Sequence, residues 1–127
     1  MDSSKIKKIK KDFNFLHERV MAVLLFGSFV KGEESTRSDV DICIIAPYEK
    51  DKINFLGEIM SKTWGYDVRL FELMPLYMKM EVIKNHKIIY ARNISELYEY
   101  FYFYRKLWKD QEQRQRITKE EAIRLFE

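Results

Sequence analysis

The chain has 127 residues, a formal net charge of +3, 46% hydrophobic residues and 34% charged residues. This length fits one domain with a single core, and it leaves no room for separate catalytic and recognition domains. No apolar run approaches the roughly 20 residues of a membrane span, and the N-terminal lysines are not followed by the apolar segment of a signal peptide. The small net charge, with lysines interleaved among carboxylates, argues against direct nucleic-acid binding. With a single cysteine, Cys43, and no export signal, we expect a soluble, cytoplasmic chain.

Hydrophobic periodicity predicts alternating helices and strands along the chain. Apolar residues three and four apart predict a helix through the first twenty residues. Short apolar or β-branched runs, and alternation in the third case, predict four strands. In chain order, the elements after the first helix are a strand at 22–26, a short helix at 29–34, a strand at 40–46, a helix from 53 that stops at Gly65, a strand at 66–73, a helix at 75–85, a strand at 87–91, a helix at 95–112 capped by Ser95, and a last short helix from Thr118. The sequence therefore predicts an α+β fold, a small mixed sheet of about four strands flanked by helices.

The first predicted strand runs directly into Gly27 and Ser28. Backbone N–H groups and the Ser28 hydroxyl would then face the space beyond the strand end, an arrangement that collects phosphate oxygens. Gly27 has no Cβ, so the backbone can come close to a ligand there. Taken alone, the pair is equally typical of a strand-to-helix turn with a capping serine.

Asp39 and Asp41 lie two residues apart at the start of the second predicted strand. Both side chains should therefore leave the same face, with Val40 and Ile42 directed into the core. Two neighbouring carboxylates are unfavourable at neutral pH unless a cation lies between them. Mg²⁺ commonly combines one or two carboxylates with substrate phosphates. Together with the Gly-Ser turn, the pair predicts a site for a nucleoside triphosphate and Mg²⁺.

Phosphoryl and nucleotidyl transfer with two metal ions usually requires a third carboxylate. The third predicted strand offers Asp67 and Glu72, which are five residues apart and have opposite parity, so only one of them can face the aspartate pair. We favour Asp67, as a metal ligand or as the general base that deprotonates an acceptor hydroxyl. The alternative for Asp67 is a surface acid paired with Arg69.

A Gly-Ser pair, ten intervening residues, Asp-x-Asp and a later acid together resemble the nucleotidyltransferase superfamily that includes DNA polymerase beta. In its shortness the chain is similar to the minimal nucleotidyltransferases, the MntA-type antitoxins paired with HEPN-domain toxins. The resemblance covers residues 20–95 and implies a polymerase beta-like fold. The chain would be a single nucleotidyltransferase domain, 1–127, with a helical extension over 95–127.

The resemblance also implies a reaction and a partner. It implies two Mg²⁺ ions held by Asp39, Asp41 and Asp67, with ATP bound at Gly27 and Ser28. AMP would pass to a tyrosine hydroxyl of a HEPN toxin, which is thereby neutralised in a hetero-oligomer. Two alternatives remain: a nucleotidyltransferase subunit acting on a small-molecule or RNA hydroxyl, and a non-catalytic antitoxin that acts by binding alone.

Aromatic residues crowd the predicted C-terminal helix between Tyr98 and Trp108. They wrap around more than one helical face, which is more than a half-buried helix on a small sheet can cover. Either the helix crosses the domain and buries two sides, or one side stays open for a partner.

Overall fold

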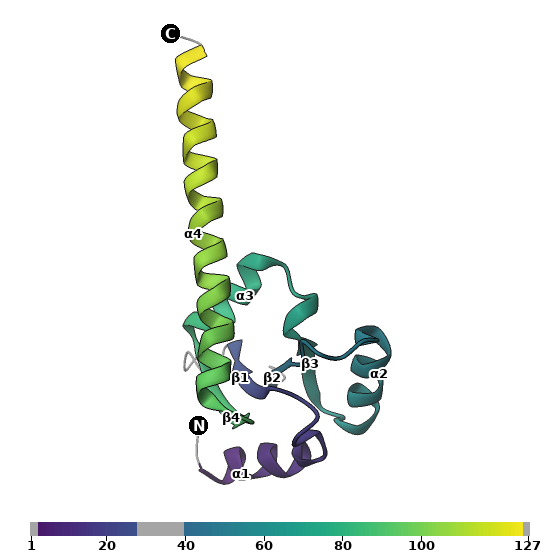
Figure 1. Ribbon diagram of the computed structural model, residues 1–127. Coiled ribbons are helices and arrows are strands. Elements are labelled where there is room, and N and C mark those ends of the chain that lie inside the picture. The colour runs from purple at the N-terminus through teal and green to yellow at the C-terminus, as the bar shows by residue number, and fades with distance from the viewer. Residues whose placement is uncertain (1–2, 28–39, 126–127) are drawn as a thin grey trace.

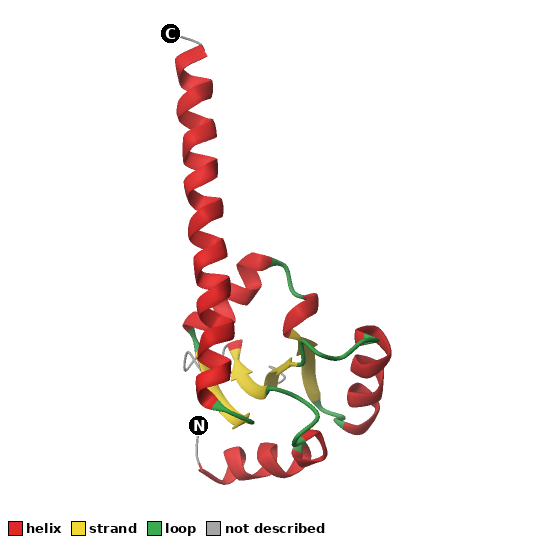
Figure 2. Ribbon diagram, viewed as in Figure 1, coloured by secondary structure: helices red, strands yellow, loops and turns green. Residues whose placement is uncertain are grey.

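The computed structural model of the chain describes residues 3–27 and 40–125, apart from the side chains of 116–118. In this part of the chain, four strands form one sheet with helices on both of its faces (Figures 1 and 2). The helices and strands are α1 (Ser3–Asp12), β1 (Ala22–Phe26), β2 (Val40–Ile45), α2 (Lys52–Lys62), β3 (Tyr66–Leu70), α3 (Leu76–Lys84), β4 (His86–Ala91) and α4 (Ile94–Leu125). The predicted α+β architecture is confirmed.

The sheet is mixed, as predicted, and its strand order is β3-β2-β1-β4. Strand β1 pairs antiparallel with both β2 and β4, while β2 and β3 run parallel. The parallel pair is joined through α2, which gives the chain the length it needs to return to the same end of the sheet. As a result, the end of β1 meets the starts of the other three strands.

Both faces of the sheet are buried, which explains why β1 reads as a continuous apolar run instead of an alternating one. Val23 and Leu25 of β1 belong to a core cluster that also contains residues of α1 and α2. Ala22 and Leu24 belong to a second cluster, with residues of α3 and α4. The sheet is thus the middle layer between two pairs of helices.

The first helix is shorter than predicted. It ends at Asp12 and is followed by a 3₁₀ turn at Asn14–Leu16, so a single helix through residue 20 was wrong. The turn packs Phe13 and Leu16 into the same core cluster, and Glu18 then has a φ of 70°, which an α-helix cannot accommodate. The apolar spacing was real, but it arises from a helix and a turn that share one core.

The third strand and the start of α4 also differ from the prediction. Strand β3 ends at Leu70, and the last predicted strand residues form a 3₁₀ turn at Phe71–Leu73. The cap of α4 is Asn93 and not Ser95, because the Asn93 side chain accepts a hydrogen bond from the Glu96 N–H at 3.1 Å.

The C-terminal helix is continuous through 32 residues, so the separate helix predicted from Thr118 was wrong. The sequence from Ile94 to Leu125 contains no glycine or proline, and nothing else there ends a helix. Its C-terminal half extends well beyond the rest of the domain (Figure 1). The short helix predicted at 29–34 lies outside the described residues.

The aromatic stretch of α4 divides between buried and exposed positions. Leu97 and Phe101 are fully buried in the cluster with α3. Tyr98, Tyr102 and Phe103 are 48%, 65% and 58% exposed. One side of α4 is therefore open, which agrees with the second of the two alternatives considered for this helix.

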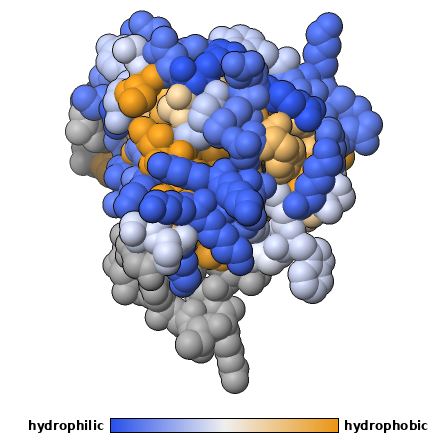
Figure 3. Space-filling model, turned by 90° about the horizontal axis from the view of Figure 1, so that it is seen from below, coloured by the Kyte–Doolittle hydropathy of each residue, from blue (hydrophilic) through white to orange (hydrophobic). Residues whose placement is uncertain are grey.

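Seen from below, where α1 lies, the surface is mostly hydrophilic, with hydrophobic residues in smaller patches (Figure 3). The lysines of α1 contribute to this polar surface, because only Ile9 of that helix is buried. None of the described helices, α4 included, combines the length and the apolar character that crossing a membrane requires.

The buried side of α4 should carry most of what that helix contributes to stability. We expect Phe101→Ala to lower the free energy of unfolding by about 3–5 kcal/mol, because it leaves a cavity in a closed core. The matched control is Phe103→Ala on the exposed side, which should change it by no more than about 0.5 kcal/mol. Urea unfolding followed by circular dichroism measures both, and equal losses would contradict this description of the helix.

Candidate functional site

The candidate site lies where the end of β1 meets the starts of its neighbours. Across the sheet, Phe26 is in register with Asp41, and Asp41 is in register with Asp67. Phe26 is also in register with His86, the first residue of β4. We call this end of the sheet, marked by Gly27, Asp41 and Asp67, the aspartate end.

Asp41 and Asp67 leave the same face of the sheet. As predicted, Val40 and Ile42 pack into the core formed with α1 and α2, so Asp41 faces the α3 side together with Cys43. Because Asp67 is the parallel partner of Asp41, it leaves the sheet on that side too. Neighbouring strands lie about 4.7–4.9 Å apart, which brings the two carboxyl groups close enough to share a ligand.

Gly27 touches Asp41 in a way that only glycine allows. A Cβ built on Gly27 would lie 2.3 Å from Oδ2 of Asp41 and 3.0 Å from its Cγ. The φ of Gly27 is also +81°, in the region that side chains other than glycine rarely adopt. The close approach that the sequence suggested for a ligand is therefore already used to seat the Asp41 carboxylate against the backbone.

Two of the predicted site residues, Ser28 and Asp39, lie outside the described residues. Of the proposed phosphate-binding turn, the structure describes Gly27 alone, and of the aspartate pair it describes Asp41 alone. Within the described residues, no three His, Cys, Asp or Glu side chains are grouped closely enough to hold a metal ion. A metal site with three carboxylates at this end of the sheet would require Asp39.

Asp67 has the partner that its alternative interpretation predicted. Nη2 of Arg69 lies 3.5 Å from Oδ2 of Asp67, and the two side chains are 47% and 39% exposed. An exposed pair of this kind contributes about 0–1 kcal/mol, so it is easily rearranged. The ion pair with Arg69 is therefore weak enough to leave Asp67 available for a functional role.

Glu72, the other candidate for the third carboxylate, lies beyond the opposite end of β2. Its Oε1 accepts a hydrogen bond from the Ala46 N–H at 2.8 Å, and its Oε2 accepts one from the Tyr100 hydroxyl at 2.8 Å. Burial raises the pKa of Glu72 above its ordinary value of 4.5, and the two hydrogen bonds oppose that rise. Both oxygens are used to join β2 to α4.

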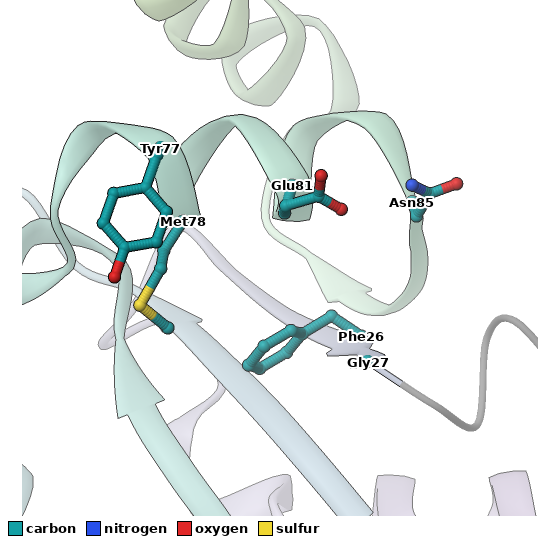
Figure 4. Close-up of a pocket in the computed structure, with 6 residues that line it drawn as sticks. All are labelled: Phe26, Gly27, Tyr77, Met78, Glu81 and Asn85. Carbon is teal, nitrogen blue, oxygen red and sulfur yellow. The ribbon is translucent and has the colours of Figure 1, made fainter. Parts of the chain in front are cut away.

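A small hollow opens beside Gly27, with a volume of about 210 Å³. Figure 4 shows Phe26 on the strand below it and Tyr77 and Met78 on α3 above it, with Glu81 further along that helix and Asn85 just after its end. Its lining is mainly apolar, with an aromatic ring on each side and polar groups at one end. Sequence analysis missed the α3 residues, because no motif marks them and only the packing of α3 brings them to Gly27.

A second hollow, of about 360 Å³, also has Met78 in its lining. It is lined by Asp67 and Arg69 from β3 and by residues following that strand, among them Leu73 and Pro75. Gly27 borders only the first hollow and Asp67 only the second. The two hollows thus flank the aspartate end and share Met78 as their common wall.

Cys43 packs in the core. It is fully buried on the same face as Asp41, in the cluster with α3 and α4. Burial raises the pKa of its thiol well above the ordinary value, which keeps it protonated and unreactive.

The contact between Gly27 and Asp41 can be tested by adding one methyl group. Gly27→Ala should lower the free energy of unfolding by at least about 1 kcal/mol, through the unfavourable φ and the displaced carboxylate. Gly57→Ala is the control, because its site on α2 is open and alanine favours a helix there by about 0.5–1 kcal/mol. Opposite signs in urea unfolding are expected, and a neutral Gly27→Ala would contradict the close approach.

The bond between Glu72 and α4 predicts a pH dependence. Because its pKa is raised on folding, Glu72 binds a proton more tightly in the folded state, and its contribution to stability falls as the pH rises from 4.5 through the raised pKa. Glu72→Gln stays neutral, and its amide oxygen can accept from the Ala46 N–H while its amide NH₂ donates to the Tyr100 oxygen. Between about pH 4 and pH 7, the unfolding free energy of the wild-type chain should therefore decline relative to that of Glu72→Gln. Parallel profiles from urea titrations would exclude this shift.

The chain matches a family of known proteins and several known structures. The sequence model of the family "Polymerase beta, Nucleotidyltransferase" matches residues 5–95. A Methanocaldococcus jannaschii protein, provisionally named a protein adenylyltransferase, is 42% identical over 106 residues, which are 84% of each chain.

Similar structures come from toxin–antitoxin complexes. A chain of a toxin–antitoxin crystal structure with AMP-PNP superposes with a TM-score of 0.65 at 22% identity, covering 91% of this chain and 96% of that one. A chain of a complex between a tri-AMPylated HEPN toxin and an MNT antitoxin from Shewanella oneidensis gives 0.62 at 19% identity, covering 94% and 98%. At these identities the likeness establishes the fold. Together with the family match and the archaeal relative, it identifies the chain as a member of the polymerase beta nucleotidyltransferase family.

Proposed function

We propose that the chain is an antitoxin that transfers AMP from ATP to a tyrosine hydroxyl of a cognate HEPN toxin and thereby neutralises it. The observation that carries this proposal is the register of Asp41 with Asp67, directly beside Gly27. Membership of the nucleotidyltransferase family, the relative named a protein adenylyltransferase and the toxin–antitoxin complexes among similar structures support it.

ATP would bind with its phosphates at Gly27 and Ser28 and its adenosine in the hollow of Figure 4. That hollow borders Gly27 and offers the rings of Phe26 and Tyr77 and the thioether of Met78 to a flat base. Glu81 and Asn85 supply polar groups at its end. A phosphate site next to an aromatic hollow matches the two chemically different parts of a nucleotide.

Two Mg²⁺ ions would be held by Asp39, Asp41 and Asp67. The donor set fits, because carboxylate oxygens are the ligands that Mg²⁺ prefers and two of these carboxyl groups are neighbours on one face of the sheet. When bound, the ions would stabilise the charge on the attacking oxygen and on the leaving phosphates. The contact with Gly27 holds the Asp41 carboxylate in a fixed position for this purpose.

In the reaction, the tyrosine oxygen attacks the α-phosphorus of ATP. An oxygen–phosphorus bond to the toxin forms, the bond from the α-phosphorus to the bridging oxygen breaks, and pyrophosphate leaves. Asp67 would accept the proton of the hydroxyl, since it borders the second hollow, where an acceptor side chain can enter from solvent. The nucleotide and the acceptor would thus approach the aspartate end through the two hollows that Met78 lines.

The experiments below distinguish this function from two alternatives. A nucleotidyltransferase that modifies a small molecule or an RNA end would use the same site with another acceptor. An antitoxin that acts by binding alone would neutralise the toxin without any transfer. The protein acceptor is favoured because the small domain leaves recognition to the partner and because the archaeal relative is named for activity on proteins.

Carboxyl-to-amide changes test the proposed site. After incubation with ATP and Mg²⁺, mass spectrometry of the purified toxin should show added AMP on tyrosine. Asp41→Asn and Asp67→Asn should each slow the addition by at least about 100-fold, because each removes a carboxylate charge that the reacting centre requires. Glu72→Gln is the control and should transfer at nearly the wild-type rate.

Three results would change the proposal. Wild-type chain that adds no AMP to the toxin would reject the substrate. A slow Glu72→Gln beside a fully active Asp67→Asn would exchange the roles of these two carboxylates. Intact neutralisation by the double variant Asp39→Ala/Asp41→Ala would establish inhibition by binding in place of transfer.

A further inference from the structure

A third hollow, with a different chemical character, lies between α3 and α4 and has a volume of about 510 Å³. We call it the basic groove. Its principal lining residues are Lys84 from α3 and Tyr102, Arg105, Lys106, Trp108 and Lys109 from α4. The hollow next to Gly27 is lined by other residues of α3, so the two sites do not share a residue.

The groove concentrates positive charge that appears evenly mixed in the sequence. The helical repeat brings Arg105, Lys106 and Lys109 to the groove, and Lys84 faces them from α3. Glu112 is the one acidic residue in the lining. Within the described part of the chain, none of these four cations forms an ion pair with a carboxylate. Their charge is available to an anionic ligand.

Two aromatic side chains flank these cations along α4. Tyr102 is 65% exposed, and Trp108 is half-buried against the core, which fixes it in place. They are six positions apart, a rise of about 9 Å along the helix, and Arg105 and Lys106 lie between them. Aromatic faces with cations between them match the alternation of bases and phosphates along a single nucleic-acid strand.

We propose that the basic groove binds single-stranded RNA, with bases stacked on Tyr102 and Trp108 and phosphates paired with Lys84, Arg105 and Lys109. RNA presents unpaired bases in its single-stranded loops, bulges and ends, and these bases are free to stack on aromatic side chains. An acidic peptide would also meet the charge of the groove, but it would give no reason for two separated aromatic faces. The net charge of the whole chain argues against nucleic-acid binding, whereas its distribution in the fold favours it. This binding is independent of the proposed AMP transfer.

Fluorescence anisotropy with a labelled single-stranded oligoribonucleotide of mixed sequence tests the proposal on the full chain. At low salt we expect saturable binding that weakens as salt is added. Arg105→Glu/Lys109→Glu should weaken it at least about tenfold, and Tyr102→Ala at least about fivefold. The matched control Lys119→Glu/Arg124→Glu reverses two exposed charges on the same helix outside the groove and should change the affinity less than about threefold.

Several outcomes would overturn the proposal. These are no binding by the wild-type chain, equal losses in the groove and control variants, and tighter binding of a duplex of the same sequence. If the groove variants bind RNA normally but lose affinity for the cognate toxin, the groove is a protein-docking surface instead. Circular dichroism of each variant confirms that α4 remains helical, so that lost binding reports the groove itself.

Discussion

The burial of both faces of one small sheet is the constraint on which the rest of this structure depends. With two pairs of helices packed on the sheet, a polar group can reach solvent from a strand only near the strand's end. The chain brings the end of β1 together with the starts of its neighbours, so Asp41 and Asp67 open onto solvent although the next residue of each strand, Ile42 or Val68, is core. The candidate site is confined to one end of the sheet because helices cover both faces.

Gly27 and Glu72 have separate structural roles at the two ends of the sheet. Because Gly27 has no side chain, the Asp41 carboxylate can lie against the backbone that follows β1. At the opposite end, both oxygens of Glu72 accept hydrogen bonds, one from Ala46 at the end of β2 and one from Tyr100 of α4. One acidic residue is thereby kept for structure, while Asp67 stays at the surface with a weak ion pair that a ligand can displace.

Much of this could be predicted from residue patterns, and the failures have identifiable causes. The central strands were found because burial on two faces gives short, continuous apolar runs. Parity showed that only one of Asp67 and Glu72 could face the aspartate pair, and the register of Asp67 with Asp41 agrees with the choice of Asp67. The first helix was drawn too long because a 3₁₀ turn can continue the spacing of a helix into the same core. The hollow beside Gly27 could not be foreseen, since Tyr77 and Met78 reach it only through the packing of α3. The basic groove was hidden because net charge says nothing about which cations share a helical face.

The stability of α4 against local unfolding differs along its length. Every described side chain from Lys109 to Leu125 is exposed, so this half of the helix is held by its own backbone hydrogen bonds and by neighbouring charges along the helix. Its local opening therefore costs progressively less toward the free end, whereas the turns around Phe101 open only with the core. A molecule that bound the distal turns would suppress their local opening, so that the whole of α4 would stay helical together with the buried turns around Phe101. The rigidity of the exposed half of the helix would then depend on the bound molecule.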